Sequence, residues 1–218
     1  MPLNIKIPNP AAYAGAVLPA VAPVLTLAER MALIPGLLGG WDASTLIQGA
    51  AVPSWAAQHG AGLASQVIVA RQPVAELADG LPVLRNTALS KNMVVDHAFT
   101  SGAVLTVGAR FKIDNTVQDF QAVFGVNAWR LLYRTTGNFQ LDTTVDVMAA
   151  GVATPGWHTV LAMQSADTTR MLVDGALYSG ANAPAVLTQL MIGASANTGT
   201  ANGFLGAIRR LVIAEADI

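Results

Sequence analysis

The stretch Arg170-Met-Leu-Val-Asp174-Gly175 decides the fold of this chain. An Asp-Gly dipeptide after an apolar run is a strong hairpin signal, because both residues accept a positive φ at low cost. Further turn signals stand at Thr136-Gly137-Asn138, Pro155-Gly156 and Asn202-Gly203. The pattern predicts antiparallel strands joined by tight turns.

Short apolar runs broken by Gly, Asn, Asp and Pro continue in both directions from this hairpin, from Trp41 onward. In Leu105–Ile113 the apolar side chains alternate with others, which places them on one face of a strand. Many short strands with no long helix between them predict an all-β fold of two packed antiparallel sheets. The expected strands are Ala64–Ala70, Val83–Arg85, Ala103–Ile113, Ala122–Val126, Trp129–Arg134, Phe139–Thr143, Trp157–Gln164, Arg170–Val173, Gln189–Gly193 and Ala207–Ala214.

The first 35 residues have a different composition. Six of the 11 prolines lie there, and proline favours extended backbone in itself and in the residue before it. We expect an extended arm over residues 1–22 and a short helix over Thr26–Ile34, capped by Thr26 with Glu29. Residues 1–35 are predicted to be an assembly segment and residues 36–218 the folded domain. A strand and a helix laid over the edge of the core are the alternative.

Composition limits the classes of function. Hydrophobic residues make up 53% of the chain and charged residues 11%, with a formal net charge of -1. A net charge near zero provides no positive potential that would attract nucleic acid, so we expect no nucleic-acid binding. Prolines interrupt every long apolar stretch, so we expect no membrane span. A surface so poor in charge favours burial against neighbours, and we expect a homo-oligomer or a part of a larger assembly. The absence of cysteine excludes disulfides and thiolate metal sites.

Several motifs in the C-terminal half resemble the laminin-G-like branch of the concanavalin A-like lectin and glucanase jelly rolls. The resemblance implies a jelly-roll sandwich in which Trp157 packs between the sheets, His158 points outward and Gly206 permits close packing. The motifs, in the order expected for this branch, are Gly156-Trp-His-Thr-Val160, Arg170-Met-Leu-Val-Asp174-Gly175, Leu190-Met-Ile-Gly193 and Phe204-Leu-Gly206-Ala-Ile208-Arg-Arg-Leu-Val-Ile213.

A second set of motifs resembles an entry sequence that precedes such jelly rolls in bacteriophage and bacterial surface proteins. It implies a virion structural protein (head decoration, fibre or tail component) located in the virion, which binds other subunits through residues 1–35. The N-terminus lacks a basic segment before an apolar core, so we expect no cleavable signal peptide. The cytoplasm, or the cell surface reached without a classical signal peptide, is the alternative location. The motifs are Trp41-Asp-Ala-Ser-Thr45, Val52-Pro-Ser-Trp55, Gly60, Gln66, Arg71-Gln-Pro73 and Gly80-Leu-Pro-Val-Leu-Arg85.

Enzymatic residues are hard to place. Glycoside hydrolysis commonly uses two carboxylates about 5 to 10 Å apart. The three glutamates, Glu29, Glu76 and Glu215, form no E-x-D-x-x-E strand of the glucanase kind. Asp142 and Asp146 are four positions apart on an expected strand, which places them on one face of it. We interpret them as solvent-exposed carboxylates of a hairpin. We therefore predict that the chain is not an enzyme.

A bound cofactor is not required by any motif. The three histidines, His59, His97 and His158, have no close spacing that would suit a metal. Calcium is the open alternative, because Asp114, Asn115 and Asp119 follow a strand and could supply oxygen ligands. Turn chemistry explains the same residues equally simply.

An exposed aromatic ring could bind a sugar, and Trp129 with Tyr133 and Tyr178 are the candidates for this role. Trp41 and Trp55 read as packing residues of the entry segment. A carbohydrate-binding module or adhesin domain for a cell-surface glycan is therefore the alternative to the virion role. A degenerate glycan hydrolase is the third reading.

Overall fold

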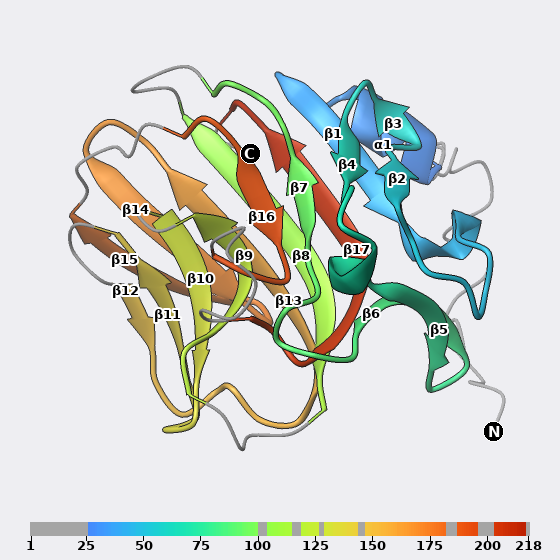
Figure 1. The fold of residues 1–218 in the computed structure, drawn as a ribbon. Helices are drawn as coiled ribbons and strands as arrows, with labels where there is room; N and C mark the ends of the chain where they lie inside the picture. The colour runs from blue at the N-terminus through green and yellow to red at the C-terminus, as the bar shows by residue number, and fades with distance from the viewer. Residues whose placement is uncertain are drawn as a thin grey trace, which may run out of the picture.

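The computed structural model describes residues 26–99, 104–114, 119–126, 129–143, 147–181, 187–195 and 203–216. Within these residues the strands form two sheets that face each other (Figure 1), and every pairing between neighbouring strands is antiparallel. The predicted all-β sandwich is confirmed. Besides the strands, the described residues hold one α-helix, α1 (Leu27–Ala32), and the 3-10 turns Ala43–Thr45 and Val69–Arg71.

The larger sheet is built around β8, which pairs along its whole length with β13 on one side and β17 on the other. A hairpin of β5 and β6 joins the sheet through β6, which pairs with the first residues of β17. The strand order is β15 (Ala176–Ala181), β14 (Thr168–Val173), β13 (Gly156–Gln164), β8 (Leu105–Ile113), β17 (Gly206–Ala214), β1 (Leu37–Asp42) and β3 (His59–Gly60), with β5 (Val74–Ala78) and β6 (Leu81–Asn86) beside them.

The smaller sheet lies in front of this one in Figure 1. Its two halves meet at β16, which pairs with β9 and β7 and so joins distant parts of the sequence. The order is β12 (Val147–Ala149), β11 (Asn138–Asp142), β10 (Trp129–Arg134), β9 (Gln121–Val126), β16 (Leu190–Ile192), β7 (Met93–Val95), β4 (Leu63–Ser65) and β2 (Ser54–Ala56).

Aromatic rings from both sheets fill the space between them. Phe111 of β8 meets Phe139 of β11 and Phe204 edge-on, with ring centroids 5.7 Å apart in both pairs. Trp41 of β1 and Trp55 of β2 are buried as expected, and the Trp41 Nε1–H donates to the Trp55 carbonyl oxygen at 2.8 Å. This hydrogen bond connects β1 of the larger sheet to β2 of the smaller sheet. It also gives a partner to an indole N–H that is buried in the core.

Two Asp-Gly dipeptides make two-residue hairpins. Asp174 and Gly175 have φ of 47° and 93° and join β14 to β15, as predicted. Asp79 and Gly80, with φ of 50° and 75°, join β5 to β6 in the same way. The second hairpin was missed, although its sequence carries the same signal.

The expected placement of Trp157 and His158 is wrong, because the two residues face the opposite ways. His158 is 6% exposed and lies on the core face beside Phe139, at a ring-centroid distance of 5.1 Å. Trp157 is half-buried on the outer face, where it packs against Ala78, Val83 and Ala207. Since the side-chain period of a strand is two, the pairing of Phe111 with His158 sends Trp157 outward.

His158 stays inside because both of its ring nitrogens find partners. Nδ1 lies 2.7 Å from the Asp174 carboxylate and Nε2 lies 2.7 Å from the Thr154 carbonyl oxygen. A buried polar group with satisfied hydrogen bonds is tolerated in a core.

The strand expected over Ala64–Ala70 is too long, since β4 ends at Ser65. The side chain of Gln66 turns the chain, because its Oε1 accepts the Ile68 N–H at 3.0 Å. The following apolar residues, Val67 and Val69, are 88% and 74% exposed rather than paired in a sheet.

The helix α1 confirms the predicted cap. Thr26 Oγ1 accepts the Glu29 N–H at 3.2 Å, and Glu29 Oε2 accepts the Thr26 N–H at 2.7 Å. Met31 is buried against β1, while residues 1–25 lie outside the described residues, so the division into an arm and a domain stays a prediction. No helix among the described residues is long and apolar enough to cross a membrane.

We predict that Gly206→Val destabilises the sandwich. A Cβ at Gly206 would lie closer than 3.0 Å to the Phe204 ring and to the Lys112 carbonyl oxygen. Overpacking of this kind costs about 1 to 3 kcal/mol of unfolding free energy, so thermal denaturation should show a Tm lower by several degrees. Lys91→Ala, in the turn between β6 and β7, should scarcely change the Tm. Equal melting points for the two variants would mean that the closing strand is not tightly packed.

Candidate functional site

The aromatic residues predicted to bind a sugar do not form a site. Trp129 and Tyr133 are 0% exposed, because β10 directs them into the core. There the ring of Trp129 packs against that of Phe124, with 5.9 Å between the ring centroids. The expectation that they offer exposed ring faces is wrong. Tyr178 of β15 is half-buried and packs against the same core.

Two of the three residues predicted as calcium ligands, Asp114 and Asp119, each bind an arginine instead. Asp114 forms an ion pair with Arg85, and Asp119 accepts hydrogen bonds from Arg134 Nε at 3.0 Å and Nη2 at 3.2 Å. The bonds from Arg134, opposed by partial burial, lower the pKa of Asp119. Asn115 lies outside the described residues, and within them no three His, Cys, Asp or Glu side chains gather as a metal site would need.

The other carboxylates considered for catalysis do not form a pair in the described structure. Asp142 is bound by Arg130, whose Nε lies 2.6 Å from its Oδ2, and Asp146 lies outside the described residues. His97 lies 3.7 Å from Glu215 at the far end of β17. These contacts lie at strand ends, and surface ion pairs of this kind contribute about 0 to 1 kcal/mol each.

A groove opens instead on the outer face of the larger sheet, over β13, β8 and β17. Its main cavity has a volume of about 410 Å³. The lining combines cationic, hydroxyl and apolar side chains, as ligand sites commonly do. The residues are Ile34, Gly108, Ala109, Arg110, Thr159, Leu161, Arg210 and Val212.

The pairing register lays these side chains out in rows. Thr159, Arg110 and Arg210 stand side by side on three neighbouring strands. The next row is Leu161, Gly108 and Val212, which makes an apolar floor. A Cβ at Gly108 would meet the Leu161 side chain at 2.9 Å, so the glycine leaves the room that Leu161 occupies.

Trp157 forms the edge of the groove beside Arg110. Its Nε1–H donates to Asp79 Oδ2 at 2.9 Å, and Lys112 Nζ donates to Asp79 Oδ1 at 2.9 Å. These two hydrogen bonds lower the pKa of Asp79. The Arg110 guanidinium lies over the Trp157 ring, 5.5 Å from its centroid. The β5–β6 turn therefore fixes the indole, and the indole in turn supports the arginine.

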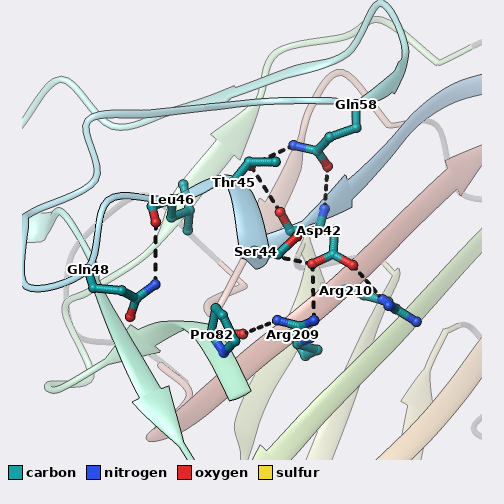
Figure 2. A network of polar contacts seen from close by, with 9 residues as sticks. All are labelled: Asp42, Ser44, Thr45, Leu46, Gln48, Gln58, Pro82, Arg209 and Arg210. Atoms are coloured by element: carbon teal, nitrogen blue, oxygen red, sulfur yellow. Dashed lines mark hydrogen bonds and ion pairs between the residues drawn. The ribbon is translucent and has the colours of Figure 1, made fainter. Parts of the chain in front are cut away.

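Arg210 is fixed from the other side of the groove by Asp42, as Figure 2 shows. Its Nε donates to Asp42 Oδ2 at 2.7 Å, while Asp42 Oδ1 accepts the Ser44 N–H at 2.9 Å. Arg209 approaches the same carboxylate at 3.6 Å and donates to the Pro82 carbonyl oxygen at 2.8 Å. Partial burial opposes ionisation of Asp42, but the hydrogen bonds from Ser44 and Arg210 prevail and lower its pKa.

A second cavity of about 220 Å³ adjoins the first, and Arg210 and Val212 line both. Gln58 is held over it, because its Oε1 accepts the Asp42 N–H at 2.5 Å and its Nε2 donates to Thr45 Oγ1 at 2.8 Å (Figure 2). His59 and Met31 complete this end, so α1 borders the groove.

Part of this site could be predicted from the sequence. The alternation in Leu105–Ile113 already directs Arg110 away from the core, and Arg209-Arg210 stands out as the pair of adjacent basic residues. Sequence reasoning missed Trp157 because the register of β13 was taken one residue out of phase. No local signal shows that Asp42 and Arg210 meet, since 168 positions separate them.

No protein-family model and no curated protein matches the sequence. Among solved structures, Trypanosoma rangeli sialidase in complex with 2,3-difluoro-KDN is similar to this chain, with a TM-score of 0.62 and 13% identity. The same sialidase in complex with sialic acid gives a TM-score of 0.62 at 14% identity. Both matches cover 84% of this chain and 31% of the sialidase, so the chain spans about a third of that protein.

A smaller match covers 54% of this chain and 78% of the CBM40 of Ruminococcus gnavus IT-sialidase, bound to α2,3-sialyllactose. Its TM-score is 0.45 at 12% identity. At 13% and 14% identity, the two sialidase structures establish the sandwich fold alone, which is consistent with a concanavalin-like jelly roll.

The prediction that the chain is not an enzyme is contradicted by these comparisons. The solved structures that share the sandwich include sialidases, and the missing E-x-D-x-x-E strand speaks only against hydrolases of the glucanase kind. Glycan hydrolysis therefore belongs among the activities to be measured.

We predict that the contribution of Asp42 to stability depends on pH. A pKa lowered on folding stabilises the fold above the unfolded value, near 3.9, and this stabilisation is lost as the pH falls through the lower folded value. Asp42→Asn should therefore lower the Tm at pH 7, and the difference from the parent protein should shrink below about pH 3.9. Asp167→Asn, in an exposed turn, should leave the Tm at pH 7 unchanged. A difference for Asp42→Asn that stays constant down to pH 3 would contradict this role of the ionised carboxylate.

Proposed function

We propose that the chain is a carbohydrate-binding β-sandwich domain and that the groove over β13, β8 and β17 holds the saccharide. The observation that carries the proposal is the row of Thr159, Arg110 and Arg210 beside the apolar row of Leu161 and Val212. Sugars present hydroxyl groups at their edges and C–H groups on their faces. A line of donors next to an apolar strip suits both surfaces.

The length of the groove supports an oligosaccharide rather than a single sugar. The two cavities meet at Arg210, and together they run from Thr159 on β13 to His59 on β3. Three further strands lie after β13 along this path, ending with β1, before β3 is reached. With about 4.8 Å between neighbouring strands, the path measures on the order of 19 Å.

The groove is also held in shape before any ligand arrives. Asp79 fixes Trp157 on one side, and Asp42 fixes Arg210 on the other. Fewer side chains then need to be ordered on binding, which raises affinity. The solved sialidase in complex with sialic acid, which shares this sandwich, makes a glycan the natural class of ligand to test first.

Glycan hydrolysis is the second candidate, and the likeness to the sialidase fold favours it. The virion role expected from the entry sequence has no support among the structures compared above and stays a prediction. Binding of a cell-surface glycan would also suit a virion component, so the two roles differ in location rather than in chemistry.

We predict that Thr159→Tyr abolishes glycan binding. Thr159 is exposed on the groove floor, so a tyrosine there fills the main cavity without disturbing the core, and tyrosine suits a strand. Glycan-array screening followed by calorimetry on the best ligand should show a loss of at least about tenfold in affinity, which corresponds to 1.4 kcal/mol. Free sugar released in the same samples would show whether the bound glycan is also cleaved.

The matched control is Ser179→Tyr, an exposed position on β15 of the same sheet but outside the groove. It should bind glycan as the parent protein does. Equal binding by both variants would place the glycan elsewhere on the molecule.

A further inference from the structure

Arg110 and Arg210 lie directly opposite each other on β8 and β17. Like charges at opposed positions of an antiparallel pair repel each other and destabilise the sheet. The surface of this chain is poor in charge, with 11% charged residues, so two arginines at one such position call for an explanation.

The two arginines are treated differently by their surroundings. Arg210 has the Asp42 carboxylate at 2.7 Å. Arg110 is exposed and rests on the Trp157 ring, and no carboxylate of the described residues forms a salt bridge with it. The Trp157 ring supports the guanidinium without neutralising its charge.

The carboxylates near the groove already have other partners. Lys112 and Arg209 add two cations beside Arg110 and Arg210, and the carboxylates of Asp79, Asp42 and Asp174 lie nearby. Asp174 accepts the Thr159 N–H at 2.7 Å and lies 2.7 Å from His158 Nδ1. Asp79 already binds Lys112 and Trp157, and Asp42 already binds Arg210 and approaches Arg209. None of the three carboxylates forms a salt bridge with Arg110.

We infer that the glycan carries an acidic group, a carboxylate or a sulfate, and that Arg110 binds it. This inference rests on the proposed function and names the class of sugar for the same groove. A guanidinium offers two parallel N–H donors that match a carboxylate or a sulfate, and bonds between charged partners are about twice as strong as neutral ones. The anion also removes the repulsion between Arg110 and Arg210.

Trp157 is a positioning residue in this arrangement. Its indole, fixed by Asp79, holds the Arg110 guanidinium in place. The acid group is then met by a side chain that is already ordered, which reduces the entropic cost of binding.

Calorimetry on the full chain tests the inference with three probes: α2,3-sialyllactose, lactose and heparin. Sialyllactose or heparin should bind at least about tenfold more tightly than lactose, and the preference should weaken at high salt. Arg110→Gln should lower the affinity for the acidic probe at least about tenfold more than the affinity for lactose, and so remove this preference. Tighter binding of sialyllactose than of lactose identifies a carboxylate, the acid group of that probe. Binding of heparin without binding of sialyllactose identifies the sulfates, because heparin carries carboxylates as well.

Two controls separate charge from structure. Lys91→Ala also removes one positive charge, but outside the groove, and should keep the preference for acidic probes. The Tm of Arg110→Gln should be equal to or higher than that of the parent protein, because the repulsion from Arg210 is relieved, whereas a purely structural role for Arg110 would lower it.

The outcomes distinguish this inference from the proposed function. Equal affinity for lactose and the acidic probes, with binding still lost in Thr159→Tyr, overturns the acidic ligand and leaves the carbohydrate-binding groove standing. A preference for acidic probes that persists in Arg110→Gln also overturns the inference. Binding of none of the probes overturns the acidic ligand, and the glycan array then decides whether the groove binds another carbohydrate.

Discussion

The pairing of β8 with β13 and β17 is the constraint on which the rest of the structure depends. Along β8, every second residue enters the core, so Phe111 faces inward with His158 and Ile208 as its partners. The residues between them face outward and make the groove. One register therefore sets both the packing of the sandwich and the order of Thr159, Arg110 and Arg210 across its surface.

A bulge in β17 exchanges the side-chain faces of that strand where it borders the groove. The register shifts between Ile208 and Arg210, so Arg209 is an extra residue beside Pro82, and Arg210 comes to stand opposite Arg110. Bulges re-aim side chains in this way, and they occur often next to binding sites. The adjacent arginines thus face the same side of the sheet although they are neighbours in the sequence.

The two Asp-Gly hairpins act beyond their turns. Asp174 binds His158 and the Thr159 N–H at 2.7 Å each, which secures the core side of β13. Asp79 binds Trp157 and Lys112, which secures the outer side of the same sheet. In both hairpins the aspartate of the turn also satisfies a polar side chain on a strand outside the hairpin.

Local patterns in the sequence determined the class of fold: the alternation in Leu105–Ile113, the turn at Asp174-Gly175 and the cap of Thr26 on α1 each follow from short-range chemistry. The resemblance to the jelly-roll motifs placed Gly206 where a strand approaches its neighbour closely, as the structure shows. The binding groove needed the tertiary structure. A shift of one residue exchanges the two faces of a strand, so the sequence could not decide whether Trp157 or His158 enters the core. Likewise, Trp129 and Tyr133 could not be recognised as buried, because burial depends on the facing sheet. The contacts of Asp42 with Arg210 and of Trp157 with Asp79 join distant parts of the chain, and only the folded sheet brings them together.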